Sequence, residues 1–219
     1  PKDFKKTMKV LEKIGKVDHD LVHEHHGMAW VDGVTVEPHY KVHNYQCPST
    51  DHAMQEMFAS VFPSELSSAD MDGYTVPVFP PTFESVFLIS HMVNHVYEEG
   101  LGLRQVIDYA MFLSSCADKI DWLQHHEYLH QMHMERAWRI FTCICVDYLG
   151  MPLPSQVEPF SHKEKMWAEK MMTDIMRVGN FGRGEYVFHH RGFKDAFNNY
   201  CWVVKRCWNL GFVCPSEAR

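Results

Sequence analysis

The alternation of apolar and polar positions changes character along the chain. Between residues 2 and 14, apolar side chains recur every three or four positions, which is typical of a helix with one buried face. The segments 20–31 and 34–43 instead alternate in the manner of strands. The Asp32-Gly33 pair between them is a strong signal for a tight turn. This part of the chain therefore predicts a helix followed by an antiparallel hairpin.

The second strand of this hairpin, GVTVEPHYKVH (residues 33–43), places its polar side chains in a regular pattern. Successive side chains of a strand point to opposite faces of the sheet. One face is therefore apolar, and the other carries a carboxylate and two imidazoles among its members, which are Thr35, Glu37, His39, Lys41 and His43. Such a face suits either a solvated sheet surface or the floor of an active site.

The rest of the chain is mostly helical in its pattern. Residues 50–61 predict a short helix, and the Asp72-Gly73 pair predicts a second turn followed by a short extended piece. Further helices are predicted at 82–99, 103–116, 120–150 (one helix or two), 161–178 and 193–208. The sequence thus predicts an α+β fold, with an α/β region at residues 1–80 and a helical domain at residues 81–219.

The composition narrows the class of protein. Of the 219 residues, 46% are hydrophobic, which is enough for a substantial core. The formal net charge of −7 argues against nucleic acid and anionic membranes as partners, because both require a basic surface. No segment approaches the roughly 18 apolar residues of a membrane span. Seven cysteines without a Cys-x-x-Cys pair indicate reduced thiols and a cytoplasmic location.

Two pairs of residues at helical spacing are candidates for binding. His91 and His95 are neighbours on one face of an otherwise apolar helix, so they either hold a metal ion or are hydrogen-bonded core histidines. Arg104 and Asp108 have the same spacing on the next helix. They form either an ordinary intrahelical ion pair or a buried guanidinium that meets an anionic ligand or locks two helices together.

Two histidine-rich segments have weaker patterns. His19, His23 and His25 fit one face of a strand, and His126, His130 and His133 fit one face of a helix. Neither segment has the strict ligand spacing of a metal motif, so both are predicted to be solvated faces. The glycine-containing segment NFGRGEYVFHHRG (residues 180–192) lacks the Lys-Ser/Thr of a phosphate-binding loop and is predicted to be a covering loop.

Two stretches together resemble the uncharacterised nucleotidyltransferase family, whose members often occur in bacterial polysaccharide gene clusters. The first is VTVEPHY, a strand that ends in Glu-x-His-aromatic, and the second is FLISHMVNHVYEEGLGLRQVIDYAMFLSSCADKIDW. The resemblance covers roughly residues 1–150. The residues that fit the family pattern in the second stretch, in order, are His91, His95, Arg104, Asp108, Asp121 and Trp122.

The resemblance implies a fold and a site. Its members have a polymerase-β-type nucleotidyltransferase domain, so the predicted sheet would be a small mixed or antiparallel remnant of that domain, packed on a mainly helical C-terminal domain. Glu37 would be the third carboxylate, a catalytic residue that binds Mg²⁺. The other two carboxylates, an Asp-x-Asp pair, are expected upstream, because the chain begins directly at a helix. Without them this chain is expected to be inactive. The candidates for substrate binding are His39, His91, His95, Arg104 and Asp108.

Three functions follow as hypotheses. The first is Mg²⁺-dependent transfer of a nucleoside monophosphate from a nucleoside triphosphate to an acceptor that the sequence does not identify. The second is a non-catalytic module that binds a nucleotide or a protein partner. The third is a hydrolase that uses a metal ion held by His91, His95 and an acid.

Overall fold

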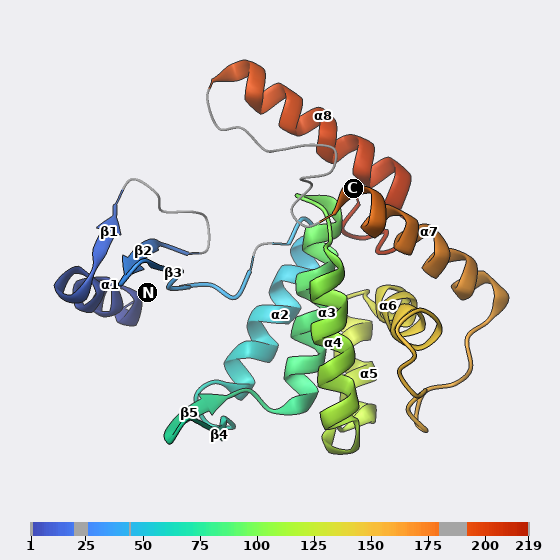
Figure 1. The fold of residues 1–219 in the computed structure, drawn as a ribbon, viewed down its shortest axis with the longest axis horizontal. Coiled ribbons are helices and arrows are strands. Elements are labelled where there is room, and N and C mark those ends of the chain that lie inside the picture. The colour runs from blue at the N-terminus through green and yellow to red at the C-terminus, as the bar shows by residue number, and fades with distance from the viewer. Residues whose placement is uncertain (1, 20–25, 44, 180–191, 219) are drawn as a thin grey trace. The chain divides into compact units, whose positions relative to one another are not determined.

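The computed structural model describes residues 2–19, 26–43, 45–179 and 192–218. Contacts between residues divide the chain into two compact units, Pro1–Asn44 and Tyr45–Arg219. Each unit is described here by itself, and their elements are labelled in Figure 1.

The first unit consists of one helix and a small antiparallel sheet. Helix α1 (Lys2–Ile14) has the predicted bounds. The sheet has the order β1 (Lys16–Asp18), β2 (Met28–Val31) and β3 (Val34–Val36), with β2 in the middle. The turn between β2 and β3 confirms the predicted hairpin. Asp32 and Gly33 there have φ angles of 51° and 81°, the left-handed conformation that this dipeptide tolerates.

The core of the first unit lies between α1 and one face of the sheet. Met8 and Leu11 of α1 are buried together with Ala29 of β2, and partly buried apolar residues pack around them, namely Phe4, Val17, Val31 and Val36. The pattern of β3 agrees with this arrangement, because Val36 faces the core and Pro38 beyond it is buried. The opposite face of the sheet is mixed, since Lys16, Asp18 and Thr35 lie on it together with Met28 and Trp30.

The strand predicted at residues 34–43 is shorter than expected. Regular pairing ends at Val36, and beyond it an isolated antiparallel bridge joins His26 to His39. The interruption falls at Pro38, whose carbonyl accepts a hydrogen bond of 3.0 Å from Gly27 N–H. Proline has no N–H with which to return the second bond of that pair, so the ladder weakens there.

The second unit begins with α2 (Pro48–Val61) and a hairpin of β4 (Ser67–Met71) and β5 (Tyr74–Val78). The turn of this hairpin is the predicted Asp72-Gly73 pair, with φ angles of 53° and 84°. Helix α3 (Pro81–Tyr97) then enters the helical core, followed by α4 (Leu103–Cys116) and the short helix η1 (Ala117–Lys119).

The predicted helical stretch 120–150 forms two helices, α5 (Trp122–Gln131) and α6 (Glu135–Asp147). The break between them lies at His133, which has a φ angle of 57°. Helix α3 is the centre of this core, since it packs against α4, α5, α6 and α8 (Figure 1). An apolar pattern around most of a helix is the sequence signature of such a central position.

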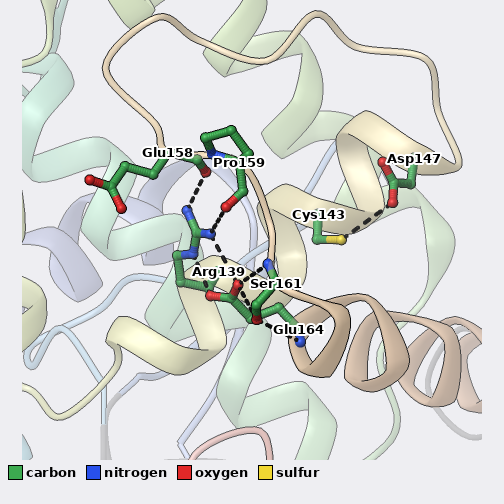
Figure 2. A network of polar contacts seen from close by, with 7 residues as sticks. All are labelled: Arg139, Cys143, Asp147, Glu158, Pro159, Ser161 and Glu164. Atoms are coloured by element: carbon green, nitrogen blue, oxygen red, sulfur yellow. Dashed lines mark hydrogen bonds and ion pairs between the residues drawn. The ribbon is translucent and has the colours of Figure 1, made fainter.

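Helix α7 (His162–Val178) is attached to α6 by Arg139, as Figure 2 shows. The Arg139 guanidinium donates to Glu164 Oε1 (2.6 Å) and to the carbonyls of Glu158 (2.8 Å) and Pro159 (3.0 Å). Glu164 also completes a capping box with Ser161 at the start of α7. The hydrogen bond from Arg139 lowers the pKa of Glu164 to about 2, so this carboxylate stays charged at neutral pH.

Helix α8 (Phe193–Leu210) is attached by a buried ion pair. Arg206 is only 3% exposed, and it lies 2.8 Å from Asp174 Oδ2 of α7. The same guanidinium donates to the carbonyl of Val96 in α3. Arg177 contacts the second oxygen of Asp174, also at 2.8 Å. One guanidinium thus joins three helices.

The C-terminal segment returns to the start of α2. Glu217 is buried, and its Oε2 accepts hydrogen bonds from the backbone N–H groups of Gln46 (2.7 Å) and Cys47 (3.3 Å). Cys47 is the N-cap residue of α2 and makes no side-chain cap itself. The Glu217 carboxylate therefore caps the helix from the far end of the sequence.

The fold class is α+β, as predicted, with small antiparallel sheets and a mainly helical remainder. The contacts group residues 45–80 with the helices of the second unit. The division of the chain into two domains near residue 80 stays a prediction. Within the described ranges, no helix has both the length and the apolar character needed to cross a membrane.

Replacing Asp174 with alanine tests how far the second unit depends on the buried ion pair. The change leaves the Arg206 guanidinium buried without its principal carboxylate, and breaking a buried pair in this way costs about 3–5 kcal/mol. We expect the free energy of unfolding, measured by urea denaturation, to fall by that amount. The control is Asp108→Ala, which breaks an exposed ion pair and should cost less than about 1 kcal/mol. Equal losses in the two variants would contradict the importance of burial.

Candidate functional site

Glu37 lies on the open face of the sheet in the first unit, directly after β3. Its neighbours Val36 and Pro38 face the core, so the Glu37 side chain points to the opposite face, where it is exposed. The register of β2 and β3 pairs Ala29 with Val36, and the bridge of His26 and His39 continues the same register. Glu37 therefore stands opposite Met28.

The same row of the sheet contains a second carboxylate, which the sequence did not reveal. Met28 of the central strand pairs with Asp18 of β1 on its other side. Asp18 and Glu37 thus flank Met28 on one face, two strand spacings apart, or roughly 10 Å between backbones. The strand β1 has only three residues, too few for a periodic pattern, so Asp18 was not predicted.

His39 lies on the same face as Glu37 and is exposed. Its ring is paired with that of His26 across the bridge, with 5.1 Å between the ring centroids and an interplanar angle of 30°. The prediction that Glu37 and His39 share a face therefore agrees with the strand register. The role of either side chain in binding stays a prediction.

His91 and His95 form a close pair in the second unit. They lie on one face of α3 with their Nε2 atoms 3.1 Å apart, and both are partly exposed. The ring of Phe87, one turn earlier, stacks on His91 with 6.0 Å between centroids. The face that these residues form is the part of α3 that its packing partners leave accessible.

Burial determines the charge of His95. Desolvation, together with the nearby His91, lowers the pKa of His95 to about 4. His95 is therefore a neutral imidazole near pH 7. A neutral imidazole accepts at one nitrogen and donates at the other, so it can hydrogen-bond a ligand but does not contribute a positive charge.

Arg104 and Asp108 lie near the start of α4, and the solvent surrounds both. Arg104 Nε is 3.8 Å from Asp108 Oδ2, and the side chains are 85% and 62% exposed. The alternative of a buried guanidinium that locks two helices is therefore wrong. The apolar pattern of this helix belongs to its other face, where Val106, Tyr109, Ala110 and Leu113 are buried. An exposed Arg104 can still meet an anionic ligand, and that role stays a prediction.

The last motif of the family pattern, Asp121-Trp122, has a structural function. Asp121 is the N-cap of α5, and its Oδ1 accepts from Leu123 N–H and Gln124 N–H, both at 3.1 Å. Its own N–H donates to Thr82 in the first turn of α3 (3.0 Å). Trp122 Nε1 donates to the carbonyl of Ala117 (3.0 Å). These contacts attach the start of α5 to the first turn of α3 and to η1.

The histidine-rich segments were predicted to be solvated faces, and their described residues on those faces are exposed. His126, His130 and His133 are exposed, and His130 Nδ1 contacts Glu135 Oε1 at 2.6 Å. His23 and His25, and most of the predicted loop at 180–192, lie outside the described residues. Within the described part of the chain, no group of three His, Cys, Asp or Glu side chains could hold a metal ion.

The fold and the motifs together define a class of protein, one in which a hairpin carrying a carboxylate is followed by a helical region with a His-x-x-x-His face. The comparisons identify that class. The model of the family described as "Uncharacterised nucleotidyltransferase" matches residues 1–150. The chain belongs to this family. The search of curated proteins found no match, and neither did the search of solved structures.

The low pKa of His95 predicts that acid destabilises the second unit. In the unfolded chain this imidazole regains its ordinary pKa near 6.5, so between about pH 6.5 and pH 4 only the unfolded state binds the proton. The contribution of His95 is complete above pH 6.5 and is lost as the pH falls toward 4, by about 2–3 kcal/mol. In His95→Gln, we expect a smaller loss of urea stability between about pH 7 and pH 4.5.

A control substitution separates this effect from general acid sensitivity. His162 is exposed at the start of α7, so His162→Gln should lose as much stability on acidification as the wild type. His125 is buried, and desolvation lowers its pKa to about 3, so it retains part of the acid sensitivity in every variant. If His95→Gln had the same pH dependence as the wild type, the neutral state of His95 would not contribute to stability.

Proposed function

We propose that the chain belongs to the catalytic unit of a Mg²⁺-dependent nucleotidyltransferase. This enzyme would transfer a nucleoside monophosphate from a nucleoside triphosphate to an acceptor and release pyrophosphate. The family match over residues 1–150 carries the proposal, because it includes the strand with Glu-x-His-aromatic and the His-x-x-x-His helix. Family membership supports a general nucleotidyltransferase function, and the metal, the nucleotide and the acceptor belong to the proposal.

The position of Glu37 supports its proposed role as a metal carboxylate. It is exposed on the open face of the sheet, so its oxygens can reach a ligand without a cost for burying the charge. Among the described strands, β3 pairs on one side only, with β2. A further strand that carries the other two carboxylates would fit along the second edge of β3 and bring them beside Glu37.

The described residues fit Mg²⁺ in part. Carboxylate oxygen is the ligand that Mg²⁺ prefers, and Glu37 supplies one such group. Two metal ions need more carboxylates than Glu37 provides, and in the described residues no three-membered cluster of ligands surrounds it. When bound, Mg²⁺ would neutralise the charge on the phosphate groups of the nucleotide. The role that we propose for Glu37 is to bind the Mg²⁺ ion and keep it at a fixed place on the sheet.

The helical unit would contribute to substrate binding. Arg104 is a charged and exposed guanidinium, which suits a phosphate group. His95, which is uncharged near pH 7, would bind through neutral hydrogen bonds, and His91 lies beside it on the same face. Asp108 would orient Arg104, 3.8 Å away, and His39 would contact a phosphate or a water molecule beside Glu37.

Two other functions make different predictions. A non-catalytic binding module would hold a nucleotide or a partner without turnover, so it is an outcome of the same experiments. A hydrolase with a histidine-bound metal ion would need a third ligand beside His91 and His95, and the described residues do not contain such a cluster. We therefore favour the nucleotidyltransferase.

The location that we propose is the cytoplasm, where nucleoside triphosphates are available. All seven cysteines have free thiols, and three of them are buried, Cys143, Cys145 and Cys214. Burial raises the pKa of Cys143 and of Cys145 to about 12, so these thiols are unreactive. Such thiols agree with a reducing compartment.

The substitution Glu37→Gln in the full-length protein tests the proposed function. It keeps the size of the side chain but removes the charge that would bind Mg²⁺. We expect turnover to fall about 100-fold or more, because metal stabilisation of the transition state is worth several kcal/mol. The measurement is Mg²⁺-dependent release of pyrophosphate with a panel of nucleoside triphosphates and candidate acceptors.

The control is Glu65→Gln, since Glu65 is exposed outside the sheet that carries Glu37. This variant should keep wild-type turnover, and circular dichroism should show that both variants are folded. Unchanged turnover in Glu37→Gln would remove Glu37 from the site. Nucleotide binding by the full-length wild type without turnover under any condition would support the binding module instead.

Arg104→Gln tests the contribution of the helical unit. Loss of a charge-assisted hydrogen bond to phosphate costs about 1.5–3 kcal/mol, so KM for the nucleotide should rise roughly 10- to 100-fold, with a smaller change in kcat. Lys119→Gln, at another exposed cation of the same unit, should leave KM unchanged. Equal effects of both substitutions would indicate only the general charge of the surface, and no change in either would exclude Arg104 from the nucleotide site.

A further inference from the structure

Helix α8 has the opposite amphipathicity to that of an ordinary surface helix. The side of α8 that faces the rest of the second unit has charged and amide side chains among its apolar ones. These inner residues are Asp195, Asn199, Trp202, Arg206 and Leu210. Its outer side contains large apolar side chains, which are Phe193, Phe197, Tyr200, Val204 and Trp208. We call these five residues the α8 stripe. In a monomeric protein, the large apolar side chains of a surface helix are expected to face the core, and the charged ones to face the solvent.

The α8 stripe follows the length of the helix without interruption. Its members are spaced by three or four residues, so they lie on one face over four turns. Each of them is between 47% and 89% exposed, and Phe193 and Trp208, at the two ends, are the most exposed. Single exposed apolar residues are common, but an unbroken row of large apolar side chains marks a binding surface.

Attachment of α8 to the second unit does not require the α8 stripe. The helix is held from its inner side by the ion pair of Arg206 with Asp174 and by the hydrogen bond from Trp202 Nε1 to the carbonyl of Glu98 (2.9 Å). Leu210 is buried on the same side. The outer row thus has a role other than holding the helix in place.

The size of the α8 stripe matches a protein interface. An aromatic side chain has roughly 150–250 Å² of surface to bury, so the four aromatic members at their exposed fractions present on the order of 600 Å². Two such stripes in contact would remove about 1,200 Å² from water, which is the lower end of the range for stable protein complexes. An area of about 600 Å² is at the upper end of the range for the largest apolar patch on a monomer, and patches of this size are often functional.

The charges around the α8 stripe favour a second copy of the chain as the partner. The stripe itself contains no charged residue, and Lys194 and Lys205 both lie along one of its margins. The other margin, with Ala196 and Cys207, is uncharged. A two-fold axis parallel to the helices places the lysine margin of one copy beside the uncharged margin of the other. Like charges then do not face each other across the contact.

We infer that α8 is a self-association surface, through which two copies of the chain pair stripe against stripe about a two-fold axis. An acidic membrane surface is a poorer partner, because the chain has a net charge of −7 and only two lysines border the stripe. The residues proposed for catalysis and substrate binding, among them His91 and His95, are not part of the α8 stripe.

The experiment compares the mass of the chain in solution with that of two stripe variants. Light scattering and sedimentation are measured in a reducing buffer, so that the exposed Cys201 cannot form a disulfide. We expect the wild type to be a dimer at micromolar concentration. Phe197→Glu and Trp208→Gln should weaken the dimer at least tenfold without changing the melting temperature of the monomer. Leu123→Glu, which changes an exposed leucine of α5, should remain dimeric like the wild type.

Three results would overturn the inference. The first is a wild type that stays monomeric at the highest concentration measured. The second is a dimer that both stripe variants retain unchanged. The third is a monomer in which Phe197→Glu and Trp208→Gln lower the melting temperature, because the stripe would then be covered by another part of the same chain. Binding of the monomer to phosphatidylserine vesicles, lost in both stripe variants, would assign the surface to a membrane instead.

Discussion

The second unit depends on the burial of α3. This helix packs against α4, α5, α6 and α8, and most of its side chains are removed from solvent. The part that stays accessible carries His91 and His95, so the same packing that stabilises the unit also presents this pair on a rigid support. The low pKa of His95 is a direct consequence, because the neighbouring helices exclude water from one side of the imidazole.

Ion pairs in this molecule differ in what they do because they differ in burial. Arg206 is enclosed, and its guanidinium bonds to two other helices, so it determines how α8 is oriented. Arg104 is in solvent, and its pair with Asp108 adds little to stability. An exposed charge that adds little to stability is available for a ligand, which is why Arg104 is a better candidate for binding than Arg206. The family motif is similarly divided, since Asp121 caps a helix whereas Glu37 faces solvent.

The sequence predicted the elements better than their surroundings. Periodicity located α1, α3, α4 and α7, and the two Asp-Gly pairs located both hairpin turns, because these signals are local. The strand at 34–43 was too long, since the alternation continues past Pro38 although the hydrogen-bond ladder does not. The exposure of Arg104, the row that joins Asp18 to Glu37 and the outward aromatic face of α8 depend on which neighbours pack against each element. Those contacts come from distant parts of the chain, so no local pattern records them.

The bonds from Glu217 to Gln46 and Cys47 have a consequence for the synthesis of the protein. The two partners of this contact are separated by about 170 positions, so the N-terminus of α2 is capped only after residue 217 has been synthesised. Domains generally fold as units while the chain emerges from the ribosome, the N-terminal parts first. The first unit can complete its contacts early, whereas in the second the start of α2 lacks its carboxylate cap until residue 217 has been synthesised. Growth of the helical core alone therefore does not complete the second unit, because the cap of α2 comes from residue 217.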